Sequence, residues 1–116
     1  MESFRDLIVW QKGMMMVKSI YDKTRGFPKE EIFGLRMQLR RCAVSVPSNI
    51  AEGSSRTLNK DFNRFLEYSQ GSLYEMQTQI IISTKRKFIS EESSENIENQ
   101  ITELQKMVSG FQKTLQ

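Results

Sequence analysis

The side chains that most often carry out chemistry in proteins are scarce in this sequence. It contains no histidine, the residue that most often does acid–base work or binds transition metals near neutral pH. Its one cysteine, Cys42, lies on an apolar stripe without a histidine partner, which favours a small core residue over a nucleophile. Glu67 and Glu75 lie too far apart along one helix to share a site, and no glycine-rich phosphate-binding motif is present. We therefore expect no enzymatic activity, no cofactor and no metal site.

Basic side chains are the remaining candidates for binding. The formal net charge is +3, but residues 1–60 contain 11 Lys/Arg and 6 Asp/Glu (+5), whereas residues 61–116 contain 6 and 8 (−2). This charge allows nucleic-acid binding without arguing strongly for it. The candidate phosphate ligands are Arg36, Arg40, Arg41, Arg56, Lys60 and Arg64.

These six candidates fall into two groups by their place in the expected helices. Arg36, Arg40 and Arg41 lie in the middle of a helix, where the helix dipole does not account for cations. We interpret them either as ion-pair partners of a neighbouring subunit or as phosphate ligands. The other three flank the start of the next helix, where free amides and nearby cations form an anion site, although a solvated surface is the commoner arrangement.

Hydrophobic spacing places these residues on four helices. Apolar residues recur at alternating spacings of three and four, the pattern of a helix with one buried face. The predicted helices cover about residues 4–25, 29–56 with a kink at Pro47, 59–88 and 91–115. Short connections make neighbouring helices antiparallel, so the predicted fold is all-α, an up-down-up-down four-helix bundle with residues 1–116 as one domain. In the first helix the stripe expected to face the core is Leu7, Trp10, Met14, Val17, Tyr21 and Thr24.

Apolar residues remain after such a bundle has buried one face of each helix. On the second helix a further apolar set lies nearly opposite the core stripe, and the first helix is apolar around much of its circumference. Because monomers rarely expose large contiguous apolar patches, we assign these residues to a homo-oligomer interface. The alternative is that the kink at Pro47 turns part of the second set into the core. The interface candidates are Ile8, Val9, Met16, Ile20, Phe33, Met37, Val44 and Ala51.

The sequence carries no sign of a membrane or secretory destination. No apolar run approaches the roughly 20 residues that a membrane-spanning helix needs. The first ten residues carry two acids and lack a basic start followed by an apolar stretch. We expect a cytoplasmic protein without a membrane partner.

Three segments of the sequence resemble the 23S rRNA intervening-sequence protein family. They are FRDLIVWQK at residues 4–12, FPKEEIFGLRMQLRRCAVSVPSNIAEG at 27–53 and GSLYE at 71–75. The resemblance implies a bacterial four-helix bundle that forms ring-shaped homopentamers. It also implies a relationship to the accessory variability determinant of diversity-generating retroelements, which has a basic, nucleic-acid-binding barrel. Five copies of a chain of charge +3 would together carry about +15, enough to matter for RNA or DNA.

Two functions are compatible with this expectation. The first is a non-enzymatic pentamer that binds rRNA or other structured RNA or DNA weakly through backbone phosphates. The alternative is a scaffold whose ring recruits a protein partner, such as a reverse transcriptase, with incidental nucleic-acid binding. Phosphate contacts lose affinity steeply as salt rises, so a salt titration distinguishes the two functions.

Overall fold

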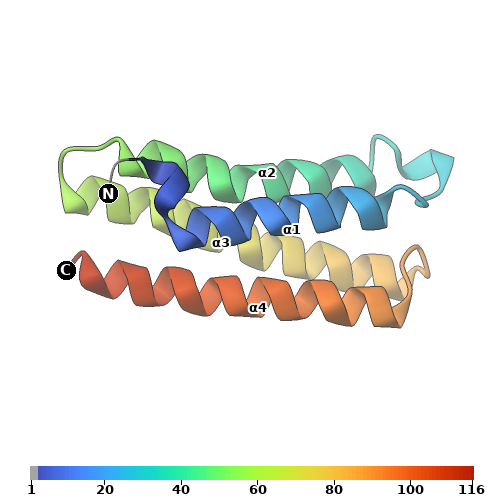
Figure 1. Cartoon of the computed structure of the whole chain (residues 1–116). Coiled ribbons are helices and arrows are strands. Elements are labelled where there is room, and N and C mark those ends of the chain that lie inside the picture. Colours follow the sequence, from blue (N-terminus) through green and yellow to red (C-terminus); the bar gives the residue numbers. More distant parts are fainter. Residues whose placement is uncertain (1–2) are drawn as a thin grey trace.

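The computed structural model describes residues 3–116 and contains four long helices (Figure 1). These are α1 (Ile8–Thr24), α2 (Leu35–Ser54), α3 (Asn59–Lys85) and α4 (Glu91–Thr114), with two short 3-10 helices, η1 (Phe4–Asp6) and η2 (Lys29–Glu31). No strand occurs among the described residues, which confirms the predicted all-α fold class. Within the same residues, no helix combines the length and the apolar character needed to cross a membrane.

The four helices lie side by side with alternating directions. α1 and α3 run one way, α2 and α4 run the other way, and the start of the ribbon and the C-terminus lie at the same end (Figure 1). The helix pairs in contact are α1 with α2, α2 with α3, α3 with α4, and α4 with α1. The side formed by α1 and α2 is therefore opposite the side formed by α3 and α4. The bundle measures 44 × 23 × 20 Å.

The first two helices begin later than the sequence predicts. Leu7 has an extended backbone (φ −72°, ψ 125°) that separates η1 from α1, so the helix predicted from residue 4 begins at Ile8. The second helix begins at Leu35 instead of residue 29, because Gly34 has a non-helical backbone (φ −109°, ψ −120°). The Glu31 carboxylate accepts a hydrogen bond of 2.9 Å from the Leu35 backbone N–H, one of the donors that a helix start leaves without a helical partner.

The connection between α3 and α4 is also tighter than predicted. α3 ends at Lys85 instead of residue 88, and Lys87 adopts a left-handed backbone (φ 62°) of the kind that terminates helices. The Ser90 side chain then accepts a hydrogen bond of 3.1 Å from the Ser93 backbone N–H and caps α4.

The buried face of α1 differs from the predicted face. Val9, Met16 and Ile20 are buried in the core, whereas Met14 and Tyr21, which the spacing places in the core, are exposed. Both sets have spacings of three and four residues, so spacing alone does not distinguish them. The buried set corrects the prediction that Val9, Met16 and Ile20 belong to a subunit interface.

A contact between α1 and α2 lies on the buried stripe of α1. Gly13 lies against Pro47, and a Cβ atom added to Gly13 would be 3.5 Å from the Pro47 Cβ. The stripe that contains Gly13 therefore faces α2 and the core. α2 continues through Pro47 as predicted, and the Asn49 side chain donates a hydrogen bond of 2.8 Å to the Ser45 carbonyl in the same region. The kink at Pro47 stays a prediction.

Candidate functional site

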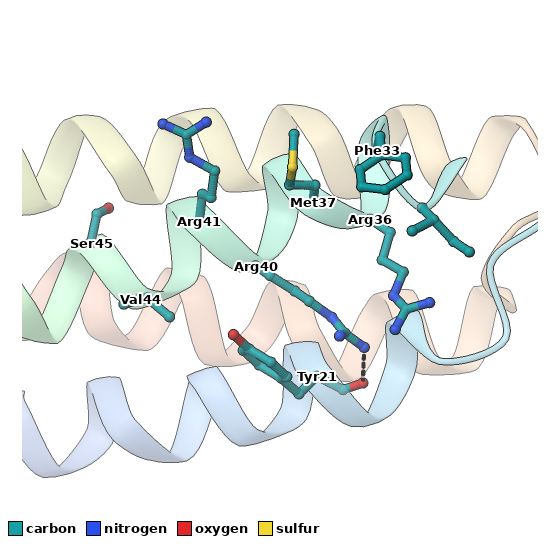
Figure 2. Close-up of a pocket in the computed structure, with 9 residues that line it drawn as sticks. Tyr21, Phe33, Arg36, Met37, Arg40, Arg41, Val44 and Ser45 are labelled. Carbon is teal, nitrogen blue, oxygen red and sulfur yellow. Dashed lines mark hydrogen bonds between the residues drawn. The ribbon is translucent and has the colours of Figure 1, made fainter. Parts of the chain in front are cut away.

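A groove on the outer side of α1 and α2 combines exposed apolar side chains with three arginines. Its volume is about 610 Å³. Figure 2 shows its lining, which comes from α1, α2 and the turn before α2. We call it the α1–α2 groove, and its residues are Tyr21, Ile32, Phe33, Arg36, Met37, Arg40, Arg41, Val44 and Ser45.

The apolar part of the groove lies on the face of α2 that points away from the core. Phe33 is 83% exposed and Val44 is 41% exposed, and Met37 between them is also exposed. These side chains lie opposite the buried stripe of α2, which includes Leu39 and Val46. The predicted second apolar face of α2 is therefore present on the surface of the subunit and is not turned into the core.

A second hollow extends this apolar surface along the bundle. Its volume is about 340 Å³, and it shares Val44 with the α1–α2 groove. Its lining also includes Met14 and Trp10 of α1 and Ala51 of α2. Four of the eight predicted interface residues thus lie along one strip, namely Phe33, Met37, Val44 and Ala51. Ile8 is exposed but lines neither hollow.

Arg40 is engaged in holding α1 against α2. Its Nε donates a hydrogen bond of 3.0 Å to Thr24 Oγ1, and a terminal nitrogen donates one of 3.2 Å to the Tyr21 carbonyl (Figure 2). Its guanidinium also lies 4.4 Å from the centre of the Tyr21 ring. Burial, with a smaller contribution from the like charge of Arg36, lowers the pKa of Arg40 from its ordinary value. Arg40 therefore satisfies a carbonyl near the end of α1, a role that sequence reasoning missed.

Loss of this contact is expected to destabilise the subunit. Arg40→Ala removes two hydrogen bonds and the stacking on Tyr21, and we expect the free energy of unfolding to fall by about 1–2 kcal/mol. Lys18→Ala is the control, because the Lys18 side chain is 82% exposed, lies outside the groove and makes only a surface ion pair with Asp22, so its effect should stay within about 0.5 kcal/mol. Urea unfolding followed by circular dichroism measures both values. Equal effects of the two variants would contradict the assigned role of Arg40.

Arg36 and Arg41 are the groove cations without such a partner. Neither forms an ion pair with any residue in the described part of the chain. In Figure 2 the Arg41 side chain points away from α1, in contrast to Arg40, which reaches towards Tyr21. These two guanidiniums beside the exposed apolar strip can bind an anionic group supplied from outside the subunit.

The other three cation candidates lie near the connection between α2 and α3. Arg56 pairs with Glu52 (3.4 Å) and stacks on the Phe65 ring, with its guanidinium 4.8 Å from the ring centre. Arg64 pairs with Asp61 at 3.2 Å, whereas Lys60 has no ion-pair partner in residues 3–116. The structure therefore does not gather all six candidates into one site.

The sequence and the fold of this chain have counterparts among known proteins. The sequence matches the family model described as 23S rRNA-intervening sequence protein over residues 5–110. The chain belongs to this family. The solved structures similar to it include the crystal structure of a protein with unknown function from the S23 ribosomal protein family of Bacteroides thetaiotaomicron VPI-5482. That structure has a TM-score of 0.82 and 22% sequence identity over 91% of this chain and 99% of the other, a likeness that concerns the fold. None of the curated proteins compared with the chain gives a match.

The single thiol of this member of the 23S rRNA-intervening sequence protein family is buried and has a raised pKa. Cys42 is buried on α2. Burial away from water raises the pKa of Cys42 to about 12, with a smaller contribution from the nearby carboxylate of Glu75. The thiol therefore stays protonated near neutral pH. No cluster of possible metal ligands occurs among the residues that the structure describes.

Proposed function

We propose that this protein works as a non-enzymatic homo-oligomer in which the α1–α2 groove is the surface that binds another copy. The single observation that carries the proposal is the exposed apolar strip around Phe33, Met37 and Val44, flanked by Arg36 and Arg41. Large apolar patches on a subunit surface mark interaction sites, and a strip of this kind is unfavourable in water. The family resemblance supports five copies in a ring.

We further propose that the assembled particle binds structured RNA or DNA weakly through backbone phosphates. Each chain has a formal net charge of +3, so five copies carry about +15, and anionic polymers accumulate near a particle of that charge. Of the six candidate cations, the one proposed for phosphate contact is Lys60, which lies outside the groove and has no ion-pair partner within residues 3–116. Arg40, Arg56 and Arg64 are less suited, because each already contacts a neighbouring side chain.

Light scattering followed by a salt titration tests both parts of the proposal. We expect a particle of about 68 kDa, five times the chain mass of 13.6 kDa, at micromolar concentration. The logarithm of its affinity for an RNA hairpin should fall linearly with the logarithm of the salt concentration, and Lys60→Ala should reduce that slope by about one for each Lys60 that contacts a phosphate. Lys106→Ala is the matched control, since it removes an exposed lysine from α4 and should leave the slope unchanged.

Two results would contradict the proposal. A particle of 13.6 kDa at all micromolar concentrations would contradict the proposed self-association. RNA binding that does not weaken as salt rises, or no RNA binding at all, would contradict the proposed phosphate contact. A salt-independent complex with a protein partner would instead favour the scaffold function.

A further inference from the structure

We propose that the α1–α2 groove of one subunit is filled by the opposite side of the next subunit, so that copies associate head to tail. This inference rests on the proposed self-association and identifies its partner surface. That surface, named here the acidic face, consists of Ile81 on α3 and Glu91, Glu95 and Glu98 on α4, and it continues along α3 to Tyr74, which lines a neighbouring hollow with Lys106.

The acidic face combines exposed apolar side chains with unpaired carboxylates. Tyr74 is 61% exposed and Ile81 is 40% exposed. A hollow of about 380 Å³ between α3 and α4 is lined by Glu91, Glu95 and Glu98 with smaller polar side chains. None of the three glutamates forms an ion pair within residues 3–116. The face is therefore the chemical complement of a groove that has apolar side chains and unpaired guanidiniums.

Hydrogen bonds between α3 and α4 place Ile81 beside the carboxylates. Gln77 Nε2 donates to Glu98 Oε1 at 3.5 Å, and Thr84 Oγ1 and Ser94 Oγ are 2.8 Å apart. Residues 77, 81 and 84 are separated by four and three positions, so they share one side of α3. Ile81 thus lies between two contacts with α4, at the edge of the acidic hollow.

The groove and the acidic face lie on opposite sides of the bundle and at nearly the same position along its axis. The order of the helices puts the α1–α2 side opposite the α3–α4 side. Gln79 of α3 donates a hydrogen bond of 3.3 Å to Gln38 of α2. Gln77, two residues earlier on α3, donates a hydrogen bond to Glu98 of α4. When subunits are arranged around an axis parallel to their bundles, each groove therefore meets the acidic face of its neighbour.

Electrostatics favour this pairing over the association of two identical grooves. A two-fold contact between grooves would bring Arg36 and Arg41 close to the same residues of the second copy, and like charges across an interface are costly. A head-to-tail contact places these guanidiniums opposite carboxylates. The net charges of the two halves of the chain agree with this pairing: residues 1–60, which include α1 and α2, carry +5, and residues 61–116 carry −2.

A head-to-tail contact also lets the assembly grow beyond a dimer, and a ring forms if neighbouring subunits are rotated relative to one another. Each subunit uses two different surfaces, so one of each stays open until the last subunit closes a ring, whereas a two-fold contact is complete at a dimer. The arrangement assigns Arg36 and Arg41 to contacts between subunits. Phosphate contact then falls to cations outside the groove, of which Lys60 is the candidate.

Mixing two assembly-defective variants tests the inference. The groove variant carries Phe33→Ser with Val44→Ser, and the face variant carries Tyr74→Ser with Ile81→Ser. All four replaced side chains are exposed, so the subunit should fold, which thermal unfolding checks. Each variant alone should sediment as a 13.6 kDa monomer, and an equimolar mixture should form a heterodimer of about 27 kDa through the one intact interface.

The possible failures are distinguishable. If the face variant assembles like the unaltered protein and the mixture yields no heterodimer, the head-to-tail contact is wrong while self-association through the groove stands. If the unaltered protein is itself a monomer, the proposed function fails and the inference fails with it. The control variant, Leu58→Ser with Tyr68→Ser, removes exposed side chains that lie outside both surfaces and should assemble normally.

Discussion

Phe33→Ser is expected to dissociate the assembly while the subunit stays folded. Phe33 is 83% exposed in the isolated subunit, so its replacement removes little intramolecular packing. In an interface, burial of a phenylalanine contributes about 1.5–3 kcal/mol, and truncating an anchor residue of this type commonly costs about 2 kcal/mol or more. A cost of ~2 kcal/mol raises the dissociation constant of each contact about 30-fold. Sedimentation over a concentration series measures this change.

Leu58→Ser provides the comparison for this result. Leu58 is 60% exposed, but it lies at the α2–α3 connection and lines neither hollow of the apolar strip. Its loss should leave the dissociation constant unchanged. An assembly that tolerates Phe33→Ser, or that responds equally to both replacements, would rule out the α1–α2 groove as the interface.

Gly53→Ala is expected to lower the stability of the subunit itself. Gly53 is buried near the end of α2, where a Cβ atom would lie 2.7 Å from the Phe65 Cβ and 2.9 Å from the Phe62 Cδ1. The Phe65 Cβ is attached directly to the backbone of α3, so the helices themselves must move apart. Overpacking of this kind costs about 1–3 kcal/mol, which corresponds to a fall in Tm of about 5 °C or more. Differential scanning calorimetry measures the change.

Gly13→Ala is the matched control and should have the opposite sign. A Cβ atom at Gly13 would be 3.5 Å from Pro47, an ordinary van der Waals distance. Because alanine favours a helix interior by about 0.5–1 kcal/mol over glycine, Gly13→Ala should leave Tm unchanged or raise it. Destabilisation of similar size in both variants would show that the contact between Gly53 and α3 is not the cause.

The helices that were predicted best are those with one clear apolar stripe. On α3 and α4 a single set of positions has the spacing of a core face, and Leu73 and Ile101 of these sets are fully buried, as is Leu39 of the core stripe predicted for α2. The outward apolar face of α2 could be predicted for the same reason, since Phe33 and Val44 lie opposite a well-defined stripe. Sequence periodicity was thus sufficient where it offered one solution.

α1 and the contacts of Arg40 could not be predicted in this way. α1 has apolar residues on much of its surface, and the buried set that includes Val9 and Met16 faces α2 on the side where Gly13 contacts Pro47. Arg40 bonds to Thr24, 16 residues earlier, and no local spacing signals such a contact. Both features depend on how two helices meet, which a pattern read along one helix does not contain.

The alternating directions of the four helices bring the start of the ribbon and the C-terminus to the same end of the bundle (Figure 1). In a ring of parallel subunits, every fluorescent protein or affinity tag fused to either terminus would therefore project from one rim. The opposite rim, with the α1–α2 and α3–α4 connections, would stay free of added sequence. Microscopy of such fusions would show label on a single side of each particle and reveal which side of the ring faces a bound polymer.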